Sequence, residues 1–246
     1  MKRVRWIIMA GVVLTSGLFA QKEGDVIINE IGNNGTRRAM YTGGDYVELL
    51  VVKPGGVRLG GWYLTDMSGQ GSEPKESEGY VRFSGADSSV FAGVIAQGTY
   101  ILVCLGKKAD NYGDAQLAED VALDDGNNRI VVFAYDSPAH MDPGKGTIAF
   151  TGKDNVALLL DWKKAGAIDI VTWEGSSSWT GAAVTVLPSD AINNGIIAYF
   201  VPPGKTVADF SDNSPAECWK SVSDVKQSTP GLVNPGVDDS ELKATK

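Results

Sequence analysis

Short apolar segments separated by turn residues run through most of the chain. Val, Ile, Leu and Tyr are concentrated in runs of seven or eight residues, and thirty glycines and ten prolines punctuate the sequence. No segment keeps the 3.6-residue period of an amphipathic helix, whereas short β-branched and aromatic runs bounded by Gly, Asn and Asp are typical of strands. We therefore predict strands over 25–31, 45–52, 57–64, 99–105, 128–135, 155–162, 167–173 and 195–201.

The run 45–52 shows how such a strand divides its side chains. Val47, Leu49 and Val51 fall on one face, which is fully apolar, while the opposite face is mixed and carries Glu48. Side chains alternate between the two faces of a strand, so one face is expected to pack on a core. Many such strands with frequent turns predict an all-β sandwich or barrel.

One strand places its apolar residues out of phase. Leu59 and Trp62 are three positions apart, whereas residues on one face of a strand recur every two. A β-bulge or sharp bend at Gly60 and Gly61 would turn Leu59, Trp62 and Leu64 all into the core, because glycine tolerates positive φ. The alternative is that one strand ends at Leu59 and another begins at Trp62 after a Gly-Gly turn.

The first twenty residues have the layout of a secretory signal peptide. Lys2, Arg3 and Arg5 precede an apolar run that ends at Ala20, and polar residues follow at once. A membrane-spanning helix is the alternative, but the run is shorter than the roughly 20 apolar residues that a bilayer requires. We expect cleavage after Ala20 and a periplasmic, cell-surface or extracellular protein, with no membrane insertion after cleavage.

Charge narrows the classes of partner. The whole chain has a net charge of −8, and removal of residues 1–20 takes away three positive charges and leaves −11. An acidic protein with scattered lysines and arginines is a poor ligand for nucleic acid, so we expect no nucleic-acid partner. The remaining 226 residues suffice for one large β-domain or two small ones.

Two cysteines lie far apart in the sequence. An oxidising compartment permits a disulfide between Cys104 and Cys218, provided that their Cα atoms lie within about 7 Å. Cys104 lies in an apolar run and is equally consistent with a small buried hydrophobe. The sequence leaves both possibilities open.

Polar segments rich in Gly and Asp mark the longer connections. We predict loops over 66–79, 106–128 and 137–147. The C-terminal segment 236–246 has almost no apolar content, so we expect a loosely held tail.

Four segments, taken in order, resemble the lamin-tail domain, an immunoglobulin-like β-sandwich that also occurs in exported bacterial proteins. They are VIINEIG (26–32), DYVELLV (45–51), VRLGGWYLTD (57–66) and STPGLVN (228–234). The stretch 106–152 is longer than the family pattern, which leaves one edge of the sandwich undefined. The motif positions are Asn29, Glu30, Glu48, Leu59, Gly61, Trp62, Leu64, Asp66, Pro230 and Gly231.

The resemblance implies a lamin-tail-like domain over 25–235 that acts as a non-catalytic binding or adaptor module. Members of the family are attached to varied partners, so the fold does not identify the partner. An unknown protein or a cell-surface glycan is expected in that role.

Candidate catalytic groups are few. His140 is the only histidine and lies in a polar segment, so a Ser-His-Asp or Cys-His arrangement would depend on one loop residue. Glu30 and Glu48 lie in strands that could be neighbours, where two carboxyl groups could act as an acid–base pair. The structural alternative is that these side chains accept hydrogen bonds and fix nearby backbone.

The acidic segment 119–128 suggests a calcium site. Asp120, Asp124, Asp125 and Asn127 offer the oxygen ligands that Ca²⁺ prefers, so calcium is the one possible cofactor. Their spacing does not match the Asp-x-Asp-x-Asp-Gly loop, and Asp-Gly and Gly-Asn sequences form hairpin turns by themselves. Turn formation is the competing interpretation.

Four aromatic residues suggest a carbohydrate site. Trp173, Trp179, Tyr199 and Phe200 lie near the polar segment GSSSWTG and could form a platform for sugar rings. The alternative for Trp179 is a plug over the end of the core. A cluster of exposed, coplanar rings would favour a glycan ligand, whereas an apolar patch or an open edge strand would favour a protein partner.

Overall fold

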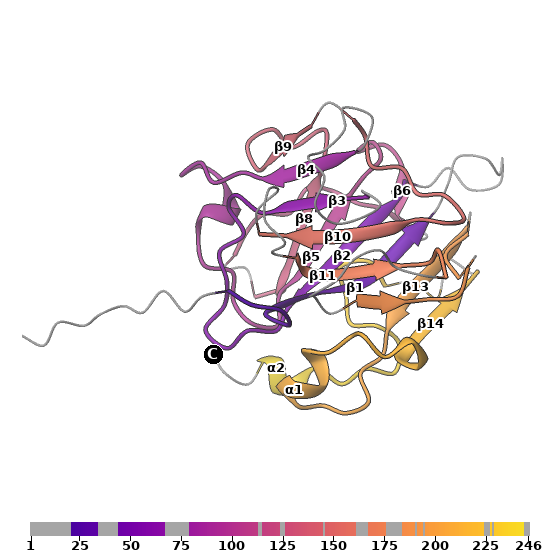
Figure 1. The fold of residues 1–246 in the computed structure, drawn as a ribbon. Helices are drawn as coiled ribbons and strands as arrows, with labels where there is room; N and C mark the ends of the chain where they lie inside the picture. The colour runs from indigo at the N-terminus through magenta and orange to yellow at the C-terminus, as the bar shows by residue number, and fades with distance from the viewer. Residues whose placement is uncertain are drawn as a thin grey trace, which may run out of the picture.

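The apolar runs form the central strands of two six-stranded sheets, which pack face to face in the computed structural model (Figure 1). Within the part of the chain that is described, no helix has the length and apolar character needed to cross a bilayer. The structure describes residues 21–33, 44–66, 79–112, 115–123, 126–144, 146–160, 167–175, 184–189, 191–193, 195–223, 227 and 229–243.

The two sheets are mixed, because each contains one parallel pair among antiparallel neighbours. The first sheet has the order β14 (Trp219–Val222), β13 (Ile196–Phe200), β1 (Val26–Asn33), β2 (Tyr46–Val51), β5 (Tyr100–Cys104) and β8 (Arg129–Phe133). The second sheet has the order β12 (Val184–Val186), β11 (Ala167–Thr172), β10 (Asn155–Leu159), β3 (Tyr63–Thr65), β4 (Tyr80–Phe83) and β9 (Met141–Pro143). The remaining elements are β6 (Asn111–Tyr112), β7 (Ala115–Gln116), α1 (Val207–Phe210), α2 (Ser240–Lys243) and the 3₁₀ turns η1 (Val90–Ala92) and η2 (Ala216–Cys218).

The prediction of an all-β sandwich is confirmed, and each of the eight predicted runs contains a strand. The strands that the sequence analysis missed are β4, β6, β7, β9, β12 and β14, which have only two to four residues each. Such strands carry too few alternating positions to be recognised without their neighbours. The loops predicted over 106–128 and 137–147 accordingly contain the β6–β7 pair and β9.

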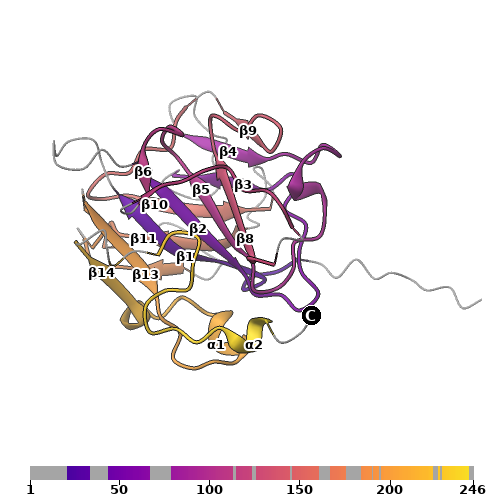
Figure 2. The same ribbon diagram turned by 180° about the vertical axis from the view of Figure 1, so that it is seen from behind.

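The core lies between the sheets, and it receives the face of β2 that the sequence predicted. Val47, Leu49 and Val51 are fully buried there. The opposite face of β2 is also buried, because Tyr46 joins Leu102 and neighbouring apolar side chains in a second cluster on the outer face of the first sheet. That outer face therefore has a cover of its own, in part from the C-terminal segment seen in front of the sheet in Figure 2.

The two glycines before β3 form a β-turn. The backbone N–H of Trp62 donates to the carbonyl of Leu59 at 2.9 Å, and Gly61 has φ +96°. The predicted outcome is confirmed, since Leu59, Trp62 and Leu64 are all buried in the core. The structure has the Gly-Gly turn of the alternative interpretation and not the β-bulge. The turn reverses the chain between Leu59 and Trp62, so both side chains can point into the core although they are three positions apart.

Both cysteines are free thiols. Cys104 ends β5, and Cys218 immediately precedes β14, so the strands β13, β1 and β2 lie between them in the first sheet. Adjacent strands are about 4.8 Å apart, which places the two thiols far beyond the reach of a disulfide. The disulfide that the sequence left open is therefore absent.

The C-terminal segment is not the loosely held tail that we expected, at least over residues 236–243. Leu242, in α2, is buried, and Asp239 accepts a hydrogen bond from the hydroxyl of Tyr100 at 2.9 Å. Lys243 forms an ion pair with the same carboxylate at 2.7 Å. Leu242 and Asp239 thus help to dock a segment whose composition is almost entirely polar. We call residues 229–243 the C-terminal strap.

Candidate functional site: a glutamate pair beneath the C-terminal strap

Glu30 and Glu48 lie directly opposite each other in the antiparallel β1–β2 pair. The register shifts between Ile28 and Glu30, so Asn29 is an extra residue that bulges from β1. The bulge lets the Asn29 amide nitrogen donate to Glu48 Oε1 at 2.7 Å, on the same face as the two carboxyl groups. Neither glutamate has any exposed surface. The prediction that these residues are neighbours is confirmed.

Tyr46 supplies a hydrogen bond to Glu30. Its register partner in β1 is Gly32, and the tyrosine ring occupies the space that a side chain at Gly32 would fill. The ring can therefore lie flat along the sheet, and its hydroxyl donates to Glu30 Oε1. The second oxygen, Glu30 Oε2, is buried and has no hydrogen-bond partner.

The C-terminal strap closes over the pair. The backbone N–H of Gly231 donates to Glu48 Oε2, and Gly231 follows Pro230 in a turn at φ +78°. The Asn234 amide nitrogen donates to the carbonyls of Phe200 at 3.0 Å and Asn29 at 3.4 Å. The motif segments 26–32 and 45–51 and residues 229–234 of the fourth motif, far apart in sequence, thus meet at one place on the first sheet.

Burial dominates the electrostatics of the pair. Loss of hydration raises the pKa of Glu30 to about 7, although hydrogen bonds from Tyr46 and the Thr229 backbone lower it in part. Burial and the adjacent charge of Glu30 raise the pKa of Glu48 well above its usual range. Among the residues that the structure describes, no lysine or arginine forms an ion pair with either glutamate. The pair therefore favours holding at least one proton.

A second buried carboxyl group lies between the two sheets. Asp169 in β11 accepts hydrogen bonds from the backbone N–H of Ile28 and from the Asn213 amide nitrogen. Its other oxygen is buried without a partner, and burial raises its pKa to about 7. Sequence reasoning missed Asp169, although an aspartate inside the run AIDIVTW is the kind of signal that identifies a buried polar group.

His140 has a structural role in this fold. Its Nδ1 accepts a hydrogen bond from the backbone N–H of Val90 at 3.2 Å, and its carbonyl accepts from Ser84 at 2.9 Å. Asp66, a motif position, accepts from the backbone N–H groups of Gly79 and Ala149, both at 3.1 Å. These contacts join loops of the second sheet and leave neither side chain in a catalytic arrangement.

The predicted aromatic platform does not form from the residues that are described. Trp173 and Phe200 are fully buried, and Tyr199 is 5% exposed. The Trp173 indole donates to the carbonyl of Thr151 at 2.8 Å, so its face belongs to the core. This corrects the interpretation of these three residues as sugar contacts, because all three rings are buried. Trp179 lies outside the described residues.

The predicted calcium ligands are only partly described. Asp124 and Asp125 lie outside the described residues, while Asp120 and Asn127 contact each other at 2.9 Å. Arg129 also contacts the Asp120 carboxylate at 3.3 Å, and the Asn127 side chain accepts the backbone N–H of Arg129 at 2.9 Å. These bonds build a turn stabilised by an ion pair. Within the described ranges, no three His, Cys, Asp or Glu side chains are arranged to hold a metal ion.

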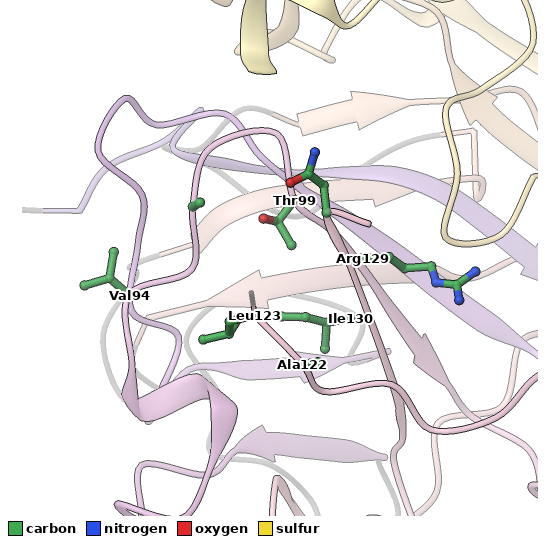
Figure 3. Close-up of a pocket in the computed structure, with 8 residues that line it drawn as sticks. Val94, Thr99, Ala122, Leu123, Arg129 and Ile130 are labelled. Carbon is green, nitrogen blue, oxygen red and sulfur yellow. The ribbon is translucent and has the colours of Figure 1, made fainter. Parts of the chain in front are cut away.

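A shallow hollow lies beside this turn (Figure 3). Its rim carries two exposed apolar side chains, Val94 and Leu123, and Arg129 extends away from them. Its volume is about 50 Å³. Sites for small molecules are on the order of 300 Å³ or more, so the hollow does not suit a sugar or a cofactor.

Comparison with protein families, with curated proteins and with solved structures gives no match for this chain.

Proposed function

We propose that this chain is an exported, non-catalytic binding or adaptor module of the lamin-tail type, and that its partner is a protein. The family assignment rests on the order of the four motifs and on the meeting of three of them, since 26–32 and 45–51 pair as β1 and β2 and the strap crosses them. The polar motif residues Asn29, Glu48 and Gly231 are joined there by hydrogen bonds. A shared structural role for these positions supports the resemblance.

We propose a non-catalytic module because a substrate cannot reach the buried carboxyl groups. Glu30 and Glu48 are register partners in the β1–β2 pair, and both are fully buried. A general acid or base must reach the proton it transfers within about 3 Å or through one water. A pair sealed beneath the strap does not meet that condition.

The observation that carries the choice of a protein partner is the open edge at β14. This strand ends the first sheet, and Lys220 and Ser221 in it are exposed. The backbone N–H of Val201 donates to the Cys218 carbonyl at 2.8 Å, which marks a hydrogen-bonded pair. Bonding alternates along an antiparallel ladder, so the backbone groups of Ser221 point outward. An outward N–H and C=O can pair with an extended segment of another protein.

The test blocks that edge without disturbing β13. Ser221→Pro removes the outward N–H, and Ser221→Ala is the matched control because it keeps that group. We expect the mature chain to capture a partner from the envelope or medium of its own cells, with capture lost in Ser221→Pro and kept in Ser221→Ala. Circular dichroism establishes that both variants are folded.

A glycan array on the mature chain tests the alternative, a carbohydrate-binding module. Glycan binding that is lost in Trp179→Ala, with no protein captured, would overturn the proposal. Capture that survives Ser221→Pro would show that the partner binds elsewhere.

A further inference from the structure

Two of the contacts between the strap and the first sheet involve carboxyl groups. Gly231 donates its backbone N–H to Glu48, and Tyr100 donates its hydroxyl to Asp239 further along the strap. Figure 2 shows the strap crossing in front of β1 and β2 before it reaches α2. The state of charge beneath the strap therefore bears directly on how firmly it is held.

Among the described residues, the sheet register and the contacts identify the titratable side chains near the pair. One row across the sheet contains Lys220, Tyr199, Glu30, Glu48, Leu102 and Val131, in that order. Tyr46 donates a hydrogen bond to Glu30. Tyr100 donates a hydrogen bond to Asp239 and interacts electrostatically with Glu48. Arg129 lies against Gly231, and its guanidinium contacts Asp120. Lys220 is exposed, at the solvent end of the row.

The hydrogen bonds indicate where a proton resides. Both oxygens of Glu48 accept hydrogen bonds, from Asn29 and from Gly231, as a carboxylate does. Glu30 accepts hydrogen bonds from the Tyr46 hydroxyl and from the Thr229 backbone, yet its Oε2 is buried without a hydrogen-bond partner. One proton shared by the pair leaves a single charge in the site, and the unpartnered Oε2 of Glu30 is a position that can carry it.

We propose that this proton fastens the C-terminal strap, and that its loss releases the strap from the outer face of the first sheet. Among the described residues no cation pairs with either glutamate, so a second buried charge in the site is stabilised only by water, and water enters when the segment around Gly231 lifts. This proton-dependent closure of the strap goes beyond the proposed binding function and does not depend on it.

The direction of the pH effect follows from linkage. With the strap closed, Glu30 titrates near 7, and in an open, hydrated site it returns toward 4.5. The closed state therefore binds more protons between these values, and closure weakens as the pH rises from about 4.5 to 7. The pKa of Glu48 is also raised by burial and by the charge of Glu30, so its titration weakens closure in the same direction.

Amide hydrogen exchange of the mature chain, followed by mass spectrometry, tests the proposal. After correction for the intrinsic pH dependence of exchange, we expect protection of peptides from 229–243 to fall by about tenfold per pH unit between pH 5 and 7. Strand β10 is the internal reference, because its exchange reports opening of the second sheet. A strap whose protection is constant, or falls only in parallel with β10, would overturn the proposal.

Two variants assign the effect to the pair. Glu30→Gln keeps the shape of the side chain and removes the titration, so its strap protection should be nearly independent of pH. Asp169→Asn is the matched control, since it removes a buried carboxyl group away from the strap and should keep the slope. If strap protection still falls with pH in the double variant Glu30→Gln, Glu48→Gln, the proposal is contradicted. If either variant fails to fold, the comparison of strap and β10 protection in the wild type tests the proposal instead.

Discussion

The ring of Tyr46 occupies the space beside Gly32 that a side chain would need. The two residues are register partners, and this placement brings the tyrosine hydroxyl to Glu30. We expect Gly32→Ala to lower the free energy of unfolding by about 2 to 4 kcal/mol, because the ring must move and a buried carboxyl group loses its donor. Urea denaturation measures the change.

Gly85 provides the control for this substitution. A methyl group there would meet only backbone atoms at 3.8 Å or more, which is ordinary van der Waals contact. Gly85→Ala is expected to change stability by less than about 1 kcal/mol. Equal effects at the two positions would show that Tyr46 does not depend on Gly32.

Gly61 tests backbone strain separately from packing. At φ +96°, the nearest atom to an added Cβ is a flexible Arg82 nitrogen at 3.7 Å, so the site has room for a side chain. We expect Gly61→Ala to cost about 1 to 2 kcal/mol through left-handed strain alone, and Gly61→Asn to cost less, because Asn tolerates this region better. Thermal unfolding compares the two, and an alanine variant as stable as the asparagine variant would argue against the turn.

Asp169 makes stability fall with rising pH. Its pKa is about 7 in the folded protein and 3.8 as an ordinary aspartate, so the folded state binds more protons between these values. The contribution of Asp169 to the free energy of unfolding is complete below about pH 3.8 and is lost as the pH rises toward 7. The total loss is on the order of 4 kcal/mol. Denaturant midpoints at pH 5 and 8 should differ less in Asp169→Asn than in the wild type.

An exposed carboxyl group controls for that comparison. Glu174 is exposed one residue beyond Trp173, and Glu174→Gln should leave the pH dependence of the midpoint as it is in the wild type. A wild type that is more stable at pH 8 than at pH 5 would contradict the direction assigned to the buried carboxyl groups.

Leu242 tests whether the C-terminal helix contributes to the fold. The side chain is 1% exposed, whereas Leu232 in the same strap is 56% exposed. We expect Leu242→Ala to lower the free energy of unfolding by about 2 to 3 kcal/mol and Leu232→Ala to change it little. Similar small losses in both variants, measured by urea denaturation, would restore the picture of a loosely held tail.

The strands could be predicted where alternation is long enough to be read. Val47, Leu49 and Val51 give their face directly, and the glycines before Trp62 give the change of phase, although not its mechanism as a turn. The aromatic platform failed for the opposite reason. Trp173 and Phe200 carry no mark that distinguishes a ring in the core from a ring in a binding site, because that difference depends on which face another segment covers.

The sequence by itself determined the β class and the approximate positions of the eight main strands, and the family resemblance pointed to Asn29, Glu30 and Glu48. The strands follow from local alternation and local turn chemistry, which each segment carries within a few residues. Only the tertiary structure decided that the two glutamates face each other, that Asp169 lies between the sheets and that the strap seals the outer face. Register, sheet order and burial join residues up to two hundred positions apart, and no local pattern encodes such pairings.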